Sequence, residues 1–105
     1  MSKNMIIYSV SCTVSTHIAE DWFQFFKEKH LNDVINTGYF THYSFRKIIE
    51  NEVSDIVTFI AEYYCNSLED LAAYNENAAP ILKKEVNELF GGQYICSRQL
   101  YQVLI

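Results

Sequence analysis

The feature that most constrains the fold is the order of two kinds of segment along the 105 residues: segments in which apolar residues recur at every second position, and segments in which they recur at helical spacing. Residues 5–14 alternate with a period of two, which predicts a β-strand. The next segment, which Ser15 or Thr16 can cap, repeats large apolar side chains at helical spacing and ends at Gly38. The first third of the chain therefore predicts a strand followed by a helix.

The middle of the chain predicts two further strands. Residues 40–49 and 54–65 are rich in β-branched and aromatic residues, and the polar link Glu50-Asn51-Glu52 between them predicts a hairpin. The second of these strands is apolar on both faces, which is typical of a strand that is covered from both sides.

The last third of the chain predicts a helix and a final strand. Ser67, with Asp70 three residues later, resembles a capping box and begins a pattern of apolar residues at helical spacing that runs to Phe90. Pro80 lies inside this pattern and predicts a kink or a break just before it. Residues 94–104 alternate again and predict a strand.

The resulting order, β-α-β-β-α-β, predicts an α+β fold in one domain over residues 1–105. It is the order of the ferredoxin-like sandwich, a four-stranded antiparallel sheet with two helices on one face. Such a sandwich exposes the other face of its sheet, yet apolar side chains occur on both faces of these strands. A second copy of the chain is the simplest cover, so we expect a homodimer that forms a barrel.

Charge and composition narrow the class of protein. Thirteen Asp and Glu against eight Lys and Arg give a net charge of −5, which argues against a nucleic-acid partner. No apolar run is long enough to cross a bilayer and the first residues lack a secretory pattern, so we expect a cytoplasmic protein without a membrane partner. Cys12, Cys65 and Cys96 show no C-x-x-C spacing, and we interpret them as small buried side chains.

Polar residues in apolar surroundings are the candidates for a functional site. His30 follows Phe26 by four residues and lies on or beside the apolar stripe of the first helix. It is either a core histidine with a backbone hydrogen bond or an acid/base or ligand-contacting residue in a pocket between helix and sheet. In the second case Trp22, Phe26 and Tyr64 form the apolar wall of that pocket.

His42 stands near the start of the strand that follows, where its imidazole can converge with that of His30. Such a pair can ligate a metal or haem, but no carboxylate or thiol is spaced to complete the site. We therefore predict no cofactor and keep haem or a metal as the lesser alternative.

Two arginines and one carboxylate are the remaining candidates. Arg46 and Arg98 lie on strand faces with apolar neighbours, where an unpaired guanidinium is costly. Glu62 can pair with either of them across the sheet or the dimer interface. The alternative is that the arginines anchor a small ligand that bears a carboxylate.

Several segments carry a resemblance to a known family: MIIYSVSCTV, the run DWFQFFKEKHLNDVINTGYF with its core H-x-x-D-V-x-x-T-G-x-F, SLEDLAAY, and Ala79-Pro80-x-Leu82 followed by a Gln93-Tyr94 strand with Arg98. On these segments the whole chain resembles the bacterial domain-of-unknown-function family four-two-eight-six. The resemblance implies a dimeric α/β barrel of the ferredoxin-like type, similar in shape to small monooxygenases, isomerases and haem-handling enzymes.

We therefore predict a dimeric protein that binds a small apolar or carboxylate-bearing molecule between helix and sheet. Its enzymatic form is a cofactor-independent monooxygenase or isomerase in which His30 is the acid/base group or polar anchor. The alternative is a non-catalytic structural or regulatory dimerisation module. The binding hypothesis predicts a cavity next to His30, and the alternative predicts a filled interior.

Overall fold

The computed structural model describes residues 4–49 and 55–105 of the chain. The order of elements is β1 (Ile6–Ser15), α1 (Ala19–Phe25), the π-helical turn η1 (Phe26–His30), α2 (Leu31–Asn36), β2 (His42–Lys47), β3 (Ile56–Cys65), α3 (Leu68–Asn77), α4 (Ala79–Phe90) and β4 (Tyr94–Gln102). This confirms the predicted succession of strands and helices. The hairpin link predicted at residues 50–52 lies outside the described residues.

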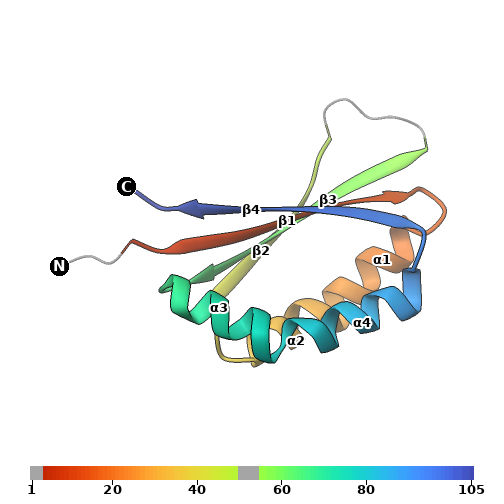
Figure 1. Ribbon diagram of the computed structural model, residues 1–105. Helices are drawn as coiled ribbons and strands as arrows, with labels where there is room; N and C mark the ends of the chain where they lie inside the picture. The colour runs from red at the N-terminus through yellow and green to blue at the C-terminus, as the bar shows by residue number, and fades with distance from the viewer. Residues whose placement is uncertain (1–3, 50–54) are drawn as a thin grey trace.

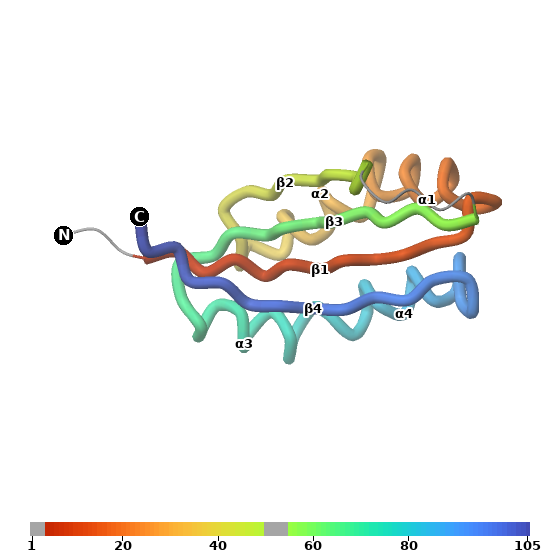
Figure 2. Tube along the Cα trace, turned by 90° about the horizontal axis from the view of Figure 1, so that it is seen from above, coloured from red at the N-terminus to blue at the C-terminus, as the bar shows by residue number. Residues whose placement is uncertain are grey.

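The four strands form one antiparallel sheet in the order β2-β3-β1-β4, which is the ferredoxin-like topology. All helices cover the same face of this sheet (Figure 1). Seen from above, α1 and α2 lie under the β2–β3 side of the sheet, and α3 and α4 lie under the β4 side (Figure 2). The predicted α+β fold with its helices in one layer is therefore confirmed.

The core lies between the sheet and the helices. Tyr8 stands opposite Tyr63 in the β1–β3 register, and Cys12 stands opposite Phe59, so the residues that face the helices repeat at every second position of both strands. Their side chains are almost all buried. This layer is rich in aromatic rings, and it takes up much of the chain's aromatic content of 15%.

Two predictions about helix ends have different outcomes. The predicted cap at Ser67 is confirmed, because its hydroxyl accepts a hydrogen bond from the backbone N–H of Asp70 at 3.1 Å. The first helix, however, begins at Ala19 and has no side-chain cap. Ser15 and Thr16 do not cap it because they still belong to strand pairing: the N–H of Thr16 donates to the carbonyl of Asp55 at 3.0 Å.

Pro80 divides the second helical region as expected. Helix α3 ends at Asn77, and α4 begins at Ala79 with the proline in its first turn, where the missing N–H has no intrahelical partner to lose. Among the described residues, no helix has the length and apolar character that a bilayer crossing needs.

The outer face of the sheet differs from the expectation of apolar residues on both faces. Strand β3 places Ile60 and Tyr64 there, as predicted, but the central strand β1 contributes Ser11 and Thr13. The hydroxyls of Thr13 and Thr58 share a hydrogen bond of 2.9 Å at this surface. The outer face is therefore a mixture of apolar and small polar side chains rather than an apolar sheet.

Candidate functional site

A pocket lies between the helix-facing side of the sheet and the helices, at the level of η1 and α4. Its volume is about 50 Å³, and rings form most of its wall: Tyr8, Trp22, Phe26, Tyr63, Tyr74 and Tyr94. His30, Lys83, Arg98 and the sulfurs of Cys12 and Cys96 are among its other lining residues. The cavity that the binding hypothesis predicts next to His30 is thus present, and Trp22, Phe26 and Arg98 share it.

Stacked rings hold the inner end of the pocket in place. Trp22 stacks on Phe26 with ring centroids 4.7 Å apart, and it also contacts Phe90 at 5.2 Å and Tyr94 at 5.0 Å. The imidazole of His30 lies 4.5 Å from the ring of Phe26. Contacts of this kind contribute beyond simple burial, so the aromatic wall is a preorganised surface.

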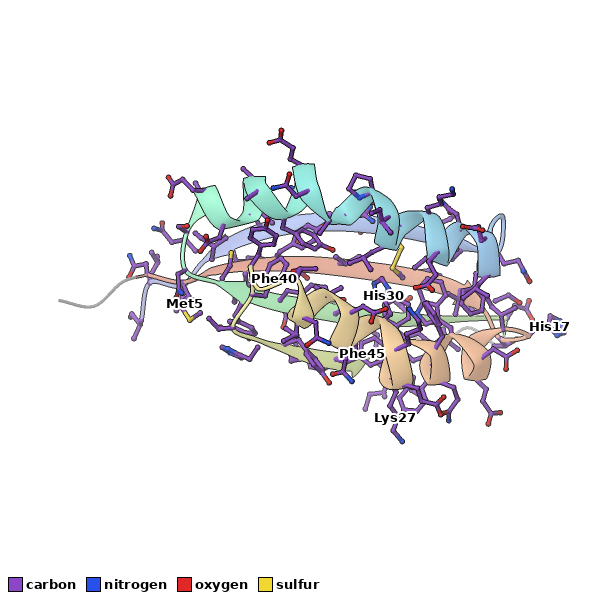
Figure 3. The ribbon with its side chains drawn as sticks, turned by 90° about the horizontal axis from the view of Figure 1, so that it is seen from below. Met5, His17, Lys27, His30, Phe40 and Phe45 are labelled. Atoms are coloured by element: carbon purple, nitrogen blue, oxygen red, sulfur yellow. A yellow bond between two sulfur atoms is a disulfide. The ribbon has the colours of Figure 1, made fainter. Side chains whose placement is uncertain are left out.

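The π-helical turn explains why His30 reaches this wall. In an α-helix of 3.6 residues per turn, each residue lies about 40° further around the axis than the residue four positions before it. A regular helix would therefore carry His30 away from the face of Trp22 and Phe26. The wider turn at residues 26–30 counteracts that rotation and keeps all three on the buried face. Such π-turns are frequent at functional sites. Figure 3 shows His30 between the helices and the sheet, whereas Lys27 points away.

Two polar atoms in this pocket have no partner. Trp22 Nε1 and His30 Nδ1 are buried and make no hydrogen bond within the described part of the chain. Buried polar groups are almost always paired, and each exception needs an explanation. Both atoms belong to side chains that line the same cavity.

Burial determines the protonation state of His30. Its side chain is only 8% exposed, and desolvation lowers its pKa from 6.5 to about 4. The carboxylates of Asp33 and Glu85 oppose this shift, and the ammonium of Lys29 adds to it. At neutral pH His30 is therefore uncharged, and its ring can accept or donate a hydrogen bond according to its tautomer.

This shift predicts a pH-dependent stability. Between pH 6.5 and pH 4 the unfolded chain binds a proton on His30 that the folded chain does not, so the stabilisation present above pH 6.5 is lost as the pH falls. The expected loss is about 3 kcal/mol. Urea unfolding followed by circular dichroism at each pH measures it.

The matched variants for this measurement are His30→Phe and His17→Phe. The first removes the titrating group from the pocket and should flatten the curve between these pH values, whereas the second changes an exposed histidine and should leave the curve as it is. An identical slope in wild type and His30→Phe would contradict the assignment.

Tyrosine hydroxyls surround the other end of the pocket. The Nε–H of Arg98 donates to the hydroxyl of Tyr8 at 2.8 Å, and the rings of Tyr63 and Tyr74 both lie 6.2 Å from that of Tyr8. Burial raises the pKa of Tyr74 to about 12 and also raises the pKa of Tyr63. These groups therefore remain neutral phenols that can donate hydrogen bonds.

The structure corrects the interpretation of two cysteines. Cys12 and Cys96 are direct partners in the β1–β4 register and form a disulfide in the wall of the pocket, shown in Figure 3 as a bond between two sulfurs. Only Cys65, which is buried, fits the description of a small free side chain. Spacing in the sequence could not reveal the pair, because its members are 84 residues apart.

Four predicted site residues lie outside the pocket, on the outer face of the sheet. The ring of His42 stacks on Tyr64 with centroids 4.2 Å apart. Arg46 forms an ion pair with Glu62, which also accepts a hydrogen bond from Ser44 at 3.2 Å. The sheet separates these side chains from His30 and Arg98. The two histidines therefore do not converge, and Glu62 pairs with Arg46 and not with Arg98.

Sequence reasoning missed Lys83, Tyr8 and Tyr74 as members of the pocket. The helical pattern contained a signal for Lys83, because it follows Ala79 by four residues and precedes Val86 by three, at the spacing of one helix face. Within the described ranges, no three His, Cys, Asp or Glu side chains gather closely enough to hold a metal ion.

Fold and pocket together define the class of protein: a ferredoxin-like α+β domain with an aromatic cavity under its sheet. The family described as Domain of unknown function (DUF4286) matches residues 5–104, so the chain belongs to that family. None of the curated proteins matches the sequence.

Solved structures show the same fold at low sequence identity. A Nitrosomonas europaea protein assigned as an antibiotic biosynthesis monooxygenase is 15% identical, with a TM-score of 0.72 over 99% of this chain and 94% of that one. SnoaB from Streptomyces nogalater, described as a cofactor-independent oxygenase, is 10% identical, with a TM-score of 0.66 over 96% and 94%. A dimeric ferredoxin-like protein from an uncultured marine organism is 10% identical, with a TM-score of 0.64 over 99% and 98%.

Proposed function

We propose that this chain binds a small ring-bearing organic molecule in the pocket between its helices and its sheet. The observation that carries the proposal is that two side chains that line one cavity, Trp22 and His30, each hold a buried polar atom without a partner, Nε1 and Nδ1 respectively. A buried polar atom without a partner costs about 1–3 kcal/mol. A ligand with a hydrogen-bond acceptor for the indole and a matching group for the imidazole recovers that cost when it binds.

The pocket limits the size and shape of the ligand. Its volume is about 50 Å³, whereas one water needs at least about 10–15 Å³. A cavity of roughly 150 Å³ holds benzene, so a single ring is the upper limit for this pocket and enters only when side chains of the wall move apart. The rings of Trp22 and Phe26 stack on one another at 20° from parallel, which fixes this part of the wall in place.

The same residues support proton transfer as the enzymatic form of this function. A neutral His30 can accept a proton from the ligand, but its low pKa makes it a weak base, so the ligand proton must be far more acidic than that of a simple phenol. Isomerisation returns that proton at another atom and needs no cofactor. Cofactor-independent oxygenation is the activity in the description of SnoaB, which shares the fold.

The single tryptophan allows a direct test of binding. In a ¹H–¹⁵N spectrum the indole N–H of Trp22 gives one resonance, and we expect it to shift in a saturable manner when phenol or benzyl alcohol is added. The variant His30→Phe should bind these compounds at least several-fold more weakly, whereas His17→Phe should bind them as the wild type does. Circular dichroism of each variant confirms that it is folded.

An indole resonance that none of these compounds moves would overturn the binding proposal. Equal affinities of the wild type and His30→Phe would remove His30 from it. If no compound binds and the chain is dimeric, the alternative of a non-catalytic dimerisation module is the better description.

We also propose that two copies of the chain associate through the outer faces of their sheets. Small side chains such as Ser11 lie at the centre of this face and permit close approach of a second sheet, while exposed Ile95 and Tyr101 lie on β4, at its edge.

Light scattering should give twice the mass of the chain. The variant Ser11→Lys should halve that mass, whereas Asn32→Lys, on an exposed position of α2, should leave it unchanged. A monomeric wild type would refute the dimer.

A further inference from the structure

Two basic side chains stand where the aromatic pocket meets its surroundings. Arg98 projects from the helix-facing side of β4, and Lys83 comes from α4. Both line the pocket of His30, and together with Tyr8 both also line the shallow groove beside it that continues past Leu71. These three residues therefore form the boundary between the enclosed pocket and the open groove.

Neither cation has an acidic partner among the described residues. The ion pairs among the described residues involve two other cations, Lys29 and Arg46, neither of which lines this pocket. Partial burial lowers the pKa of Lys83, and the nearby guanidinium of Arg98 lowers it further. Both side chains are exposed, and in a chain with a net charge of −5 they form a local positive site that attracts an anion.

The hydrogen bond to Tyr8 leaves donors free on all three side chains. Arg98 donates to the Tyr8 hydroxyl through Nε, so its terminal nitrogens are not engaged in that bond. Because the Tyr8 oxygen accepts this bond, its own proton is available to another acceptor. A guanidinium, an ammonium and a phenol that line the same boundary offer a set of donors for a planar carboxylate.

We propose that Lys83, Arg98 and Tyr8 bind the carboxylate of a small ring-bearing carboxylic acid whose ring enters the pocket. This inference rests on the proposed function and specifies its ligand class. The ring stacks on the aromatic wall and its polar substituent reaches Trp22 and His30, while the charged end remains at the boundary with the groove.

Benzoate and its neutral counterpart benzyl alcohol test this assignment, with the Trp22 indole resonance as the common readout of affinity. We expect the wild type to bind benzoate about tenfold more tightly than benzyl alcohol, as a charge-assisted hydrogen bond would give. Arg98→Gln and Lys83→Gln should each lose most of that preference, which is measured as the ratio of the two affinities in the same variant.

Matched controls remove the same charge elsewhere. Arg46→Gln lies on the opposite face of the sheet, and Lys84→Gln lies beside Lys83 but outside the pocket, so both should retain the preference for benzoate. If benzyl alcohol binds and benzoate binds no more tightly, or if the preference survives in Arg98→Gln, the carboxylate site is overturned while the pocket stands. If neither compound binds, both proposals fail.

Discussion

Replacement of Trp22 by alanine should lower the free energy of unfolding by about 4 kcal/mol, within the range measured for buried tryptophan and phenylalanine. The side chain is completely buried, at 0% exposure, and its ring joins η1, α4 and β4 through Phe26, Phe90 and Tyr94. Loss of the ring opens a cavity where three elements meet. Since small domains are stable by about 5–15 kcal/mol, this one change removes a large part of the total. Urea unfolding followed by circular dichroism measures it.

Two further variants separate packing from hydrogen bonding at this position. Trp22→Phe retains an aromatic ring and removes the unpaired N–H, so we expect a loss well below that of the alanine variant. Phe23→Ala, on the next residue but 38% exposed, should have a smaller effect than Trp22→Ala. Equal losses for Phe23→Ala and Trp22→Ala would show that Trp22 is not the centre of this core.

Reduction of the Cys12–Cys96 disulfide should lower the free energy of unfolding by about 4.5 kcal/mol in the chain-entropy account, because the bond closes a long loop in the unfolded chain. The two cysteines are 84 residues apart, and their bond joins the central strand β1 to the edge strand β4. Urea unfolding of the protein with and without a phosphine reductant measures the difference.

The double variant Cys12→Ala, Cys96→Ala provides the control for reduction. It should be as unstable as the reduced wild type, or less stable because of the small cavity, and it should not respond to the reductant. Cys65→Ala should keep the full response, since Cys65 is free. Coincident unfolding curves of the wild type with and without reductant would contradict a stabilising disulfide.

The disulfide also bears on where the protein resides. Persistent disulfides are rare in a reducing cytoplasm, so the bond between Cys12 and Cys96 weighs against the cytoplasmic location expected from the sequence. That location stays a prediction, and the redox state of the two cysteines in cells from which the protein is purified would test it.

Much of the fold was predictable because its signals are local. Periods of two and 3.6 identified the strands and helices, Ser67 marked a helix start, and Pro80 marked the break between α3 and α4. The π-helical turn at residues 26–30 was not predictable from the same pattern. Apolar residues at four-residue spacing suit a regular helix and this wider turn almost equally, and tertiary packing selects between them.

The site was predictable in part. Trp22, Phe26 and His30 were grouped correctly because they lie on one helical stripe. Arg46 and Arg98 looked alike in the sequence, since each alternates with apolar neighbours, but they lie on opposite faces of the sheet. Alternation defines two faces within each strand, yet only the register between strands shows which face of one strand continues in the next.

Local sequence signals were thus sufficient for the order of the elements, the ferredoxin-like topology and the aromatic stripe that contains His30, because each depends on residues a few positions apart. Tertiary structure alone paired Cys12 with Cys96 and brought Lys83 and Arg98 to one pocket. It also separated His42 from His30 by the thickness of the sheet. These contacts join residues that are distant in the chain, and their geometry arises only when the strands pair and the helices pack against them.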